Sequence, residues 1–317
     1  MTLHPGTINW LVIVNPNAGK CRGRKDWPVI SQLLEKENIS HTVAFTAKKG
    51  DAIHIALNAV KSGCRRIITV GGDGTLNEVV NGLFLNDVCE TTDICLGLIP
   101  VGTGNDWGRM FGIPLDYAGA TRIIKENRTM LHDVGKIIYH EGKQERTRYF
   151  INIAGLGFES VVVRRTNRMK ERGYGGKLIY FYNLLATLFS YRNTPATLSI
   201  DNQKITSDIF SVNIGNGRYC GGGMRQTPDA LPDDGLLDIT VINSMGKFEI
   251  ISNLAILYNG KILEHPKIDG YRCRKLQVNS VKLLDVECDG ESLGNTPAIF
   301  TVLPAAVNII YSTRLIQ

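Results

Sequence analysis

The segment 71–75 reads Gly-Gly-Asp-Gly-Thr and carries the strongest chemical signal in the sequence. Glycines let backbone N–H groups approach a phosphate closely, and a helix that starts there adds its positive N-terminus. The carboxylate of Asp73 could hold Mg²⁺ on the phosphates, because Mg²⁺ prefers oxygen ligands. The common nucleotide-loop patterns G-x-x-x-x-G-K-[ST] and G-x-G-x-x-G do not occur. A tight strand-to-helix turn with an exposed Asp73 is the plainer interpretation.

Two more loops of small and turn-forming residues lie in the first third of the chain. Asn-Pro-Asn-Ala-Gly at 15–19 follows the apolar run 10–14, and Gly-Thr-Gly-Asn-Asp at 102–106 follows the run 94–99. Each loop alone is weak evidence for a binding site, because these residues are ordinary turn formers. If the apolar runs are parallel strands, all three loops meet at the carboxyl edge of one sheet, where ligands bind. The three loops together therefore predict one shared phosphate site.

The elements that must position these loops alternate along the chain. Strand-like runs at 10–14, 41–46, 66–70 and 94–99 are separated by segments of helical spacing at 26–37, 51–61 and 75–85. This alternation predicts a doubly wound α/β domain over 1–130, with a parallel sheet and helices on both faces. The last strand, at 307–311, could complete either domain, so 305–317 is a candidate extension of the first.

After residue 127 the pattern changes to short segments with period-2 alternation. They predict an antiparallel β-sandwich or open barrel over 131–304, separated in places by turn residues. Helical stretches at 177–190 and 247–258 interrupt it. The expected strands are 134–139, 149–153, 197–200, 209–214, 237–242, 276–278, 282–288 and 299–303.

Composition excludes several classes of protein. The chain has 317 residues, 43% hydrophobic and 21% charged, which is typical of a globular protein of two domains. No apolar run approaches the roughly 20 residues needed to span a bilayer, and the N-terminus has no secretion-signal pattern. Seven scattered cysteines form no C-x-x-C pair and fit a reducing compartment. We therefore expect a cytoplasmic protein that meets a membrane only peripherally.

The formal net charge of +6 is concentrated in one basic segment. An aromatic-rich apolar helix at 178–189 follows this basic loop. The combination suits an anionic membrane surface, although a helix that merely covers the β domain explains it as well. A nucleic-acid partner is not expected, because no recognised motif accompanies the charge. The basic residues are Arg164, Arg165, Arg168, Lys170, Arg172 and Lys177, with Glu171 among them.

Taken together, these motifs resemble those of the diacylglycerol kinase catalytic-domain family, the soluble bacterial lipid kinases related to sphingosine and ceramide kinases. The resemblance rests on five segments in the family's order, which span nearly the whole chain. They are 15–19, Gly-Gly-Asp-Gly-Thr-Leu-Asn-Glu at 71–78, 102–106, Asp-Asp-Gly-x-Leu-Asp at 233–238, and Asp-Gly-Glu at 289–291. The Gly-Gly-Asp-Gly-Thr element alone is shared with NAD kinases and phosphofructokinases.

The resemblance implies an ATP site and two places for Mg²⁺. Asp73, Asp106 and Asp133 are expected near the Mg²⁺–water network at the phosphates. A second, structural Mg²⁺ is expected at Asp234, with backbone carbonyls near Leu231 and Leu236, although 233–235 also suits a plain turn. The implied nucleotide-binding residues are Asn15, Pro16, Asn17, Ala18, Gly19, Thr46, Gly72, Asp73, Gly74, Thr75, Leu76, Asn77, Glu78 and Thr103.

The resemblance also implies that Glu291 is the general base that takes the proton of the lipid hydroxyl, with Asp73 essential for catalysis. The expected reaction is ATP- and Mg²⁺-dependent phosphorylation of a lipid hydroxyl, first of all that of diacylglycerol to give phosphatidic acid. An NAD kinase-like enzyme and a non-catalytic lipid-binding protein on the same scaffold remain alternatives. The sequence leaves open the identity of the lipid and the oligomeric state, a homodimer included.

Overall fold

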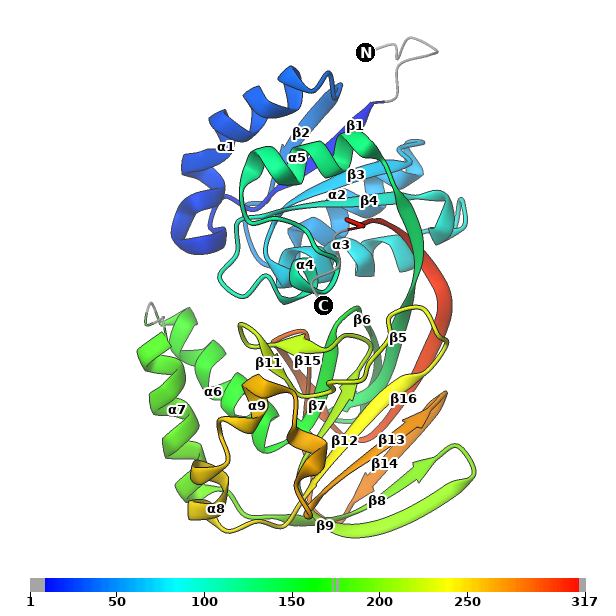
Figure 1. Cartoon of the computed structure of the whole chain (residues 1–317). Coiled ribbons are helices and arrows are strands. Elements are labelled where there is room, and N and C mark those ends of the chain that lie inside the picture. The colour runs from blue at the N-terminus through cyan, green and yellow to red at the C-terminus, as the bar shows by residue number, and fades with distance from the viewer. Residues whose placement is uncertain (1–8, 173, 175–176, 314–317) are drawn as a thin grey trace. The chain divides into compact units, whose positions relative to one another are not determined.

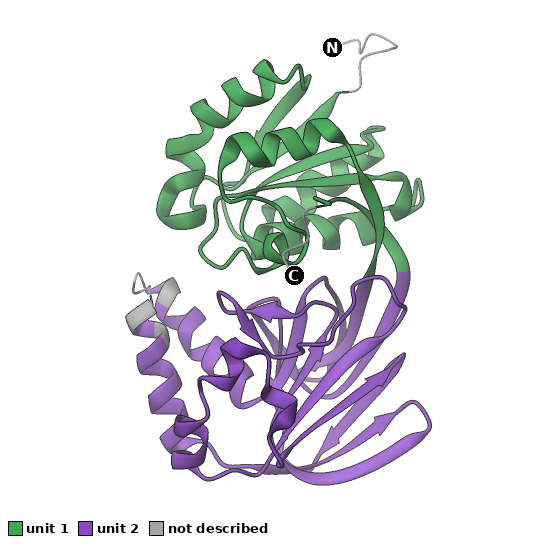
Figure 2. Cartoon of the chain, in the orientation of Figure 1, with its two compact units in different colours: residues 1–133, 305–317 green, residues 134–304 purple. Residues whose placement is uncertain are grey.

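The chain passes twice between two structural units, once within β5 (Thr129–Glu141) and once within β16 (Glu291–Ile310). The computed structural model describes residues 9–172, 174 and 177–313. The first unit holds the chain up to Asp133 and again from Ala305, and the second is Val134–Pro304 (Figure 2). The sequence had placed this division after residue 130.

Parallel strands form the centre of the first unit (Figure 1). Their order is β2 (His41–Phe45), β1 (Trp10–Val14), β3 (Arg66–Gly71) and β4 (Cys95–Pro100). The end of β16 adds a further parallel strand, with Asn308 beside Cys95. β3 and β4 are almost entirely buried, which explains why they are continuous apolar runs rather than alternating ones.

Helices connect these strands in pairs. α2 (Asp51–Lys61) packs against α3 (Asp73–Phe84), and α1 (Ala18–Lys36) packs against α5 (Tyr117–Glu126). In α2 the buried residues Ala52, Ala56 and Val60 recur every four positions, as one helix face requires. The remaining short helical elements of this unit are η1 (Thr91–Asp93) and α4 (Asp106–Met110).

Antiparallel pairs make up the second unit. One run of strands is β13-β12-β9-β7-β15-β16. A second run, β9-β8-β14-β16, begins and ends on strands that also belong to the first run. β9 and β16 are long enough to pair with different neighbours along their two halves, so the two sheets join. The strands are β6 (Gln144–Phe150), β7 (Ile153–Gly157), β8 (Thr194–Ile200), β9 (Gln203–Gly215), β10 (Tyr219–Cys220), β11 (Met224–Arg225), β12 (Leu237–Asn243), β13 (Ile268–Cys273), β14 (Lys275–Ser280) and β15 (Asp285–Cys288).

Alternation along β7, β9 and β15 divides their side chains between two faces. One face contributes Leu156, Val212 and Val286 to the main apolar core of the unit. The opposite face carries polar residues and glycine and is covered by α6 (Phe158–Glu171), with α7 (Lys177–Ser190) packed beside α6. A smaller apolar cluster around Phe158 and Phe210 joins these helices to the sheet.

Several expected boundaries were wrong. The basic residues from Arg164 to Lys170 lie on α6, not in a loop, because apolar residues such as Phe158 and Val162 anchor that helix on the sheet. Arg172 follows the helix in a turn. The single strand expected at 149–153 is broken, because the N–H groups of Ile151, Asn152 and Ile153 all donate to the side chain of Asp289.

Other differences concern helix ends. Residues 247–258 form two short helices, α8 (Lys247–Ser252) and α9 (Ile256–Asn259), followed by η2 (Ile262–Glu264). α1 was expected from residue 26 but begins at Ala18, with left-handed residues at 19–21 before the regular helix. Within the described part of the chain, no helix is long and apolar enough to cross a membrane.

Candidate functional site

The loop after β1 is bonded directly to the loop after β3. The side-chain amide of Asn15 donates to the hydroxyl of Thr75, 3.0 Å away, and its carbonyl oxygen accepts from the backbone N–H of Asn17. The backbone N–H of Asn15 donates to the carbonyl of Val70. Asn15 therefore fixes the first glycine-rich loop against the start of α3.

The loop after β4 packs on both of the others with almost no space between backbones. A Cβ on Gly102 would stand 2.5 Å from the Cα of Gly72, and a Cβ on Gly19 would stand 1.9 Å from the carbonyl oxygen of Val101. Gly19 also has φ of +59°, which strongly favours glycine. The three loops thus lie together at the carboxyl edge of the sheet, as predicted from the alternation of strands and helices.

Two of the three expected catalytic carboxylates meet around Gly104. The point where a Cβ on Gly104 would stand is 3.0 Å from Oδ2 of Asp106 and 3.2 Å from Oδ2 of Asp73. The backbone N–H of Trp107 donates to Oδ1 of Asp73 at 2.9 Å, which leaves Oδ2 on the side of Gly104. Asp73 is partly exposed, while Asp106 is buried. Oxygen ligands so arranged suit a hydrated Mg²⁺.

Asp133 has a different local role. Its buried carboxylate accepts a hydrogen bond of 2.7 Å from the backbone N–H of Ala305, where the chain re-enters the first unit. Among the described residues, no group of three or more Asp, Glu, His or Cys side chains is placed to hold a metal ion directly. The structure therefore brings Asp73 and Asp106 together and gives Asp133 a structural contact.

The other expected nucleotide residues divide into exposed and structural ones. Thr103 is exposed at the tip of its loop, whereas Thr46 is buried and its N–H donates to the carbonyl of Val14. Asn77 is fully buried and accepts from the amide of Asn81. Thr46 and Asn77 therefore shape the loops, whereas Thr103 reaches solvent.

Glu78 holds the start of α2. Its carboxylate oxygens accept the backbone N–H groups of Gly50, at 2.8 Å, and Ala52, at 3.3 Å. A carboxylate on the first N–H groups of a helix stabilises that helix end. Glu78 thus links α2 to α3, a role that the sequence did not predict.

At the start of α4, a buried imidazole supports Trp107. The indole N–H of Trp107 donates to Nε2 of His132 at 3.3 Å, and Nδ1 of His132 contacts the carbonyl of Asp133. Burial lowers the pKa of His132 to about 4, so the ring is neutral. This set positions the residue whose N–H binds Asp73.

In the second unit, Asp289 and Glu291 stand on a tight hairpin between β15 and β16. The carboxylate of Asp289 accepts the N–H groups of Ile151, Asn152 and Ile153 at 3.0, 3.1 and 3.0 Å. Asp289 and Gly290 both have positive φ. Asp289 therefore builds the turn, and the partly exposed Glu291 follows it at the start of β16.

Glu287 is a buried carboxyl behind the same hairpin. Its Oε2 accepts the backbone N–H of Gly290 at 3.1 Å. Burial first, and then the negative charges of Glu159 and Asp289, raise the pKa of Glu287 well above its ordinary value. Sequence analysis missed Glu287 because a Glu between Val286 and Cys288 is typical of a strand with one exposed face.

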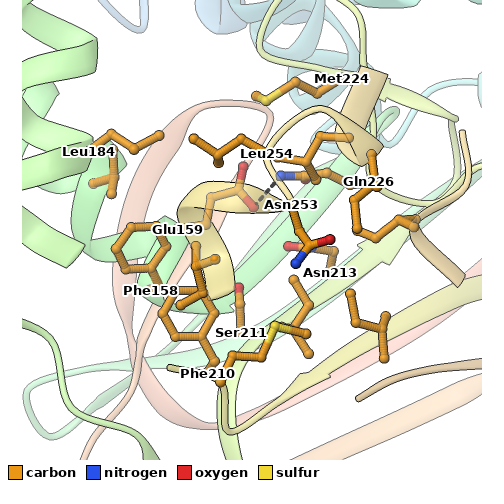
Figure 3. Close-up of a pocket in the computed structure, with 18 residues that line it drawn as sticks. Phe158, Glu159, Leu184, Phe210, Ser211, Asn213, Met224, Gln226, Asn253 and Leu254 are labelled. Atoms are coloured by element: carbon orange, nitrogen blue, oxygen red, sulfur yellow. Dashed lines mark hydrogen bonds between the residues drawn. The ribbon is translucent and has the colours of Figure 1, made fainter. Parts of the chain in front are cut away.

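An apolar pocket lies between α6, α7, α8, α9 and the sheet (Figure 3). It has an open volume of about 730 Å³, part of it open solvent. Its walls include Phe158, Leu184, Phe210, Ile250 and Leu257. Such a pocket can take a hydrocarbon chain, because apolar burial favours it.

Asp234 already contacts a cation. One carboxylate oxygen contacts the guanidinium of Arg272, and the other accepts the N–H of Leu236 at 3.0 Å. Arg272 also lies 3.4 Å from Asp238, whose pKa burial raises to about 6 despite that pairing. Leu231 is exposed. A metal at Asp234 would have to share or displace the guanidinium, so the residues as they are arranged do not fit Mg²⁺.

Two of the basic residues expected at a membrane serve the fold. Arg164 forms an ion pair of 2.7 Å with Asp285, and Arg165 donates to the hydroxyls of Thr187 and Ser190. Arg168 and Arg172 are exposed. The side chains of Lys170 and Lys177 lie outside the described residues.

Two family models together match most of the chain. The model described as "Diacylglycerol kinase catalytic domain" matches residues 9–137. The model described as "YegS C-terminal NAD kinase beta sandwich-like domain" matches residues 152–311.

Individual proteins agree with these models. A diacylglycerol kinase of Mycobacterium tuberculosis is 32% identical over 262 residues, which cover 82% of this chain and 81% of that protein. One from Staphylococcus carnosus is 28% identical over 96% of this chain and 97% of its own.

Solved structures give the same result for the fold. The crystal structure of a diacylglycerol kinase from Bacillus anthracis matches with a TM-score of 0.74 at 26% identity, covering 99% of this chain and all of that one. A yeast NADH kinase matches with a TM-score of 0.54 at 10% identity, covering 98% of this chain and 85% of its own, which shows a shared fold alone.

Proposed function

We propose, on the premise that this chain belongs to the diacylglycerol kinase family and is a lipid kinase, that ATP with Mg²⁺ is its phosphoryl donor and diacylglycerol its acceptor. The product would be phosphatidic acid. The single observation that carries the choice of a lipid acceptor is the apolar pocket, which lies in the same unit as the hairpin of Glu291.

The donor side of the proposal rests on the glycine-rich loops. Gly72 and Gly74 are partly exposed and Thr103 is exposed, so a phosphate could approach these loops, and the N-terminus of α3 favours its negative charge. Asp73 and Asp106, side by side at Gly104, would hold Mg²⁺ through oxygen or through its water ligands. When bound, that ion would neutralise charge on the transferring phosphate.

The acceptor side rests on Glu291 and the pocket. A carboxylate that follows a rigid turn can orient the lipid hydroxyl and take its proton as the phosphate is transferred. Asp289 supplies the rigidity through its three N–H contacts. The acyl chains would lie against Phe158, Phe210 and the α8–α9 segment.

Membrane contact is the remaining part of the proposal. Large apolar side chains are exposed on the helices that line the pocket, among them Phe181 and Phe189 on α7, Phe248 on α8 and Tyr258 on α9. Exposed large apolar side chains on helices around one pocket could together form an interaction surface. With the exposed Arg168 and Arg172, they would dock this edge on an anionic bilayer, from which a lipid enters the pocket.

The experiment is phosphorylation of dioctanoylglycerol, of diacylglycerol in anionic vesicles, and of NAD, with labelled ATP and a Mg²⁺ titration. We expect labelled phosphatidic acid with both lipids and none with NAD. Replacing Phe248 with Ser should raise the apparent KM for the vesicle lipid about tenfold and leave dioctanoylglycerol unchanged. Transfer to NAD, or to no lipid at all, would refute the proposal.

A further inference from the structure

Four oxygen-bearing side chains gather between the first turn of α6 and the polar face of the sheet. Asn213 on β9 pairs in register with Gly155 on β7, and Gly155 pairs with Glu287 on β15. Glu159, on the first turn of α6, accepts the amide N–H of Gln226 through Oε2 at 2.7 Å. Figure 3 shows Glu159 and Gln226 turned toward each other. These side chains come from separate elements, so only the tertiary structure brings them together.

Gly155 leaves space between two of these side chains. The position where its Cβ would stand is 3.1 Å from Oε1 of Glu287 and 3.5 Å from Oδ1 of Asn213. Gly155 is not among the residues with positive φ, so its backbone conformation does not require glycine. What glycine provides here is a space with oxygen atoms on both sides.

Two amide oxygens of the group have no hydrogen-bond partner within the part of the chain that the structure describes. They are Oδ1 of Asn213, on a residue that is 1% exposed, and Oε1 of Gln226, on a residue that is 6% exposed. Buried polar atoms are nearly always paired, and an amide oxygen can only accept. A partner for these two oxygens must therefore be a hydrogen-bond donor or a cation.

The carboxyl groups of Glu159 and Glu287 add negative charge to the same space. Glu287 is buried, and Glu159 is half-buried at the inner end of the apolar pocket, which Asn213 and Gln226 also line. Among the described residues, the partners of these carboxyls include no Lys, Arg or His. Burial first, and then the negative charge of Glu159, raise the pKa of Glu287. The N-terminus of α6 supplies only about half a positive charge, and uncompensated buried carboxylates are costly.

We propose that this group of oxygens binds a divalent cation, Ca²⁺ rather than Mg²⁺, in the space beside Gly155. Glu159 and Glu287 would each supply a carboxylate oxygen, so that two negative charges balance the ion. Oδ1 of Asn213 and Oε1 of Gln226 would supply neutral ligands. The ion would reach the site through the pocket that three of these residues line. This inference goes beyond the proposed function, because the ion takes no part in phosphoryl transfer.

The kind of ligand and the space available favour the larger ion. Hard divalent cations prefer oxygen, and the site offers carboxylate and amide oxygens. Ca²⁺ binds such protein oxygens at about 2.3–2.6 Å, whereas Mg²⁺ binds at about 2.0–2.1 Å and usually keeps several waters. The distances of 3.1 and 3.5 Å beside Gly155 need the smaller adjustment for Ca²⁺.

An ion at this place would join α6 to β7, β9 and β15. Glu287 accepts the backbone N–H of Gly290 at 3.1 Å through Oε2, the oxygen that does not face Gly155. Gly290 directly precedes Glu291 in the hairpin. The ion would therefore hold the support of that hairpin in place without touching a substrate.

The test asks whether Ca²⁺ binds and stabilises the full-length protein in the absence of ATP. The protein is dialysed against EGTA and then against CaCl₂, MgCl₂ or neither. Bound metal is counted by elemental mass spectrometry, and a melting curve is recorded for each sample. The test variants are Glu287→Gln and Gly155→Ala. Asp73→Asn and Asp234→Asn, which change the other candidate metal positions, are the controls.

We expect about one bound Ca²⁺ per chain and a melting temperature about 5 °C higher at saturating Ca²⁺, with little effect of Mg²⁺. Glu287→Gln and Gly155→Ala should lose both the bound ion and the shift. Gln at position 287 can still accept the N–H of Gly290, so this variant should melt near the wild type in EGTA. The two controls should keep the bound Ca²⁺ and the shift.

Three results would overturn the proposal. A wild type that binds no Ca²⁺ and melts equally in EGTA and Ca²⁺ would mean that the two carboxyls share a proton instead. A Ca²⁺ response that survives Glu287→Gln and Gly155→Ala, or is lost in a control, would place the ion elsewhere. An equal response to Mg²⁺ would refute the choice of ion. All these readouts are independent of kinase activity.

Discussion

The backbone N–H of Trp107 donates to Oδ1 of Asp73 at 2.9 Å, so the first turn of α4 fixes the carboxylate of the Gly-Gly-Asp-Gly-Thr loop. Asn at position 73 can still accept this bond but has no charge. Asp73→Asn should therefore keep the wild-type melting temperature and lower kcat by about 10²–10³-fold, as the loss of a key electrostatic group does. Asp73→Ala should lose both activity and part of the stability. A Mg²⁺-ATP binding titration and a melting curve on each variant check this, and an active Asp73→Asn would contradict it.

Two glycines of the glycine-rich loops should respond differently to replacement by alanine. Gly102→Ala places a Cβ 2.5 Å from the Cα of Gly72, whereas Gly74→Ala meets nothing within 4 Å. Gly102→Ala should destabilise the protein by about 1–3 kcal/mol through overpacking. Gly74→Ala should leave stability unchanged and weaken ATP binding, because its Cβ occupies space for a phosphate. Equal stability of the two variants in urea would be inconsistent with the packed loops.

Substitutions of Asp289 and of Glu291 should have separate effects, the first on stability and the second on kcat. Glu291→Gln should lower kcat by about 10²–10⁴-fold with unchanged ATP affinity and stability, since only the proton acceptor is lost. Asp289→Asn should destabilise the protein by about 1–3 kcal/mol, because one of three N–H groups then faces an NH₂ group. Denaturant unfolding and steady-state kinetics on both variants measure this. Normal turnover in a folded Glu291→Gln protein would remove the assignment of the base.

The Arg272 guanidinium should take the place of a metal ion at the Asp234 turn. Because Arg272 contacts both Asp234 and Asp238, we expect the wild-type melting temperature to be insensitive to Mg²⁺ in the absence of ATP. Arg272→Met leaves two carboxylates without that cation and should make the melting temperature rise with Mg²⁺. Arg274→Met, on a neighbouring residue, is the control. A wild type already stabilised by Mg²⁺ would support the structural metal site that the family resemblance implies.

His132 should make stability depend on pH. Its pKa is about 4 in the folded protein and about 6.5 when unfolded, so the unfolded chain binds the extra proton between these values. The stability from keeping the ring neutral is complete above pH 6.5 and is lost as pH falls toward 4, up to about 3 kcal/mol. His132→Gln cannot titrate, so its melting temperature should change less with pH across this window. Equal pH slopes in both proteins would contradict a buried neutral imidazole.

Much of the candidate site followed from local patterns. Alternation of strands and helices placed the three glycine-rich loops at one edge, because parallel strands end together. Apolar alternation likewise indicated the antiparallel second half. These features depend on residues close together in the sequence, and so the sequence expresses them directly.

What the sequence alone determined is thus the order of elements, the glycine-rich loops with Asp73, and the Asp-Gly-Glu turn. The tertiary structure alone decided that Glu78 caps α2, that Arg272 reaches Asp234, and that Glu159 and Glu287 share a buried environment. Each of these relationships joins residues from different elements, and a charged side chain has the same local signature whether it is solvated or buried. Only packing settles which it is, because burial and partners, not residue type, set the charge state and hydrogen bonds of a carboxyl group.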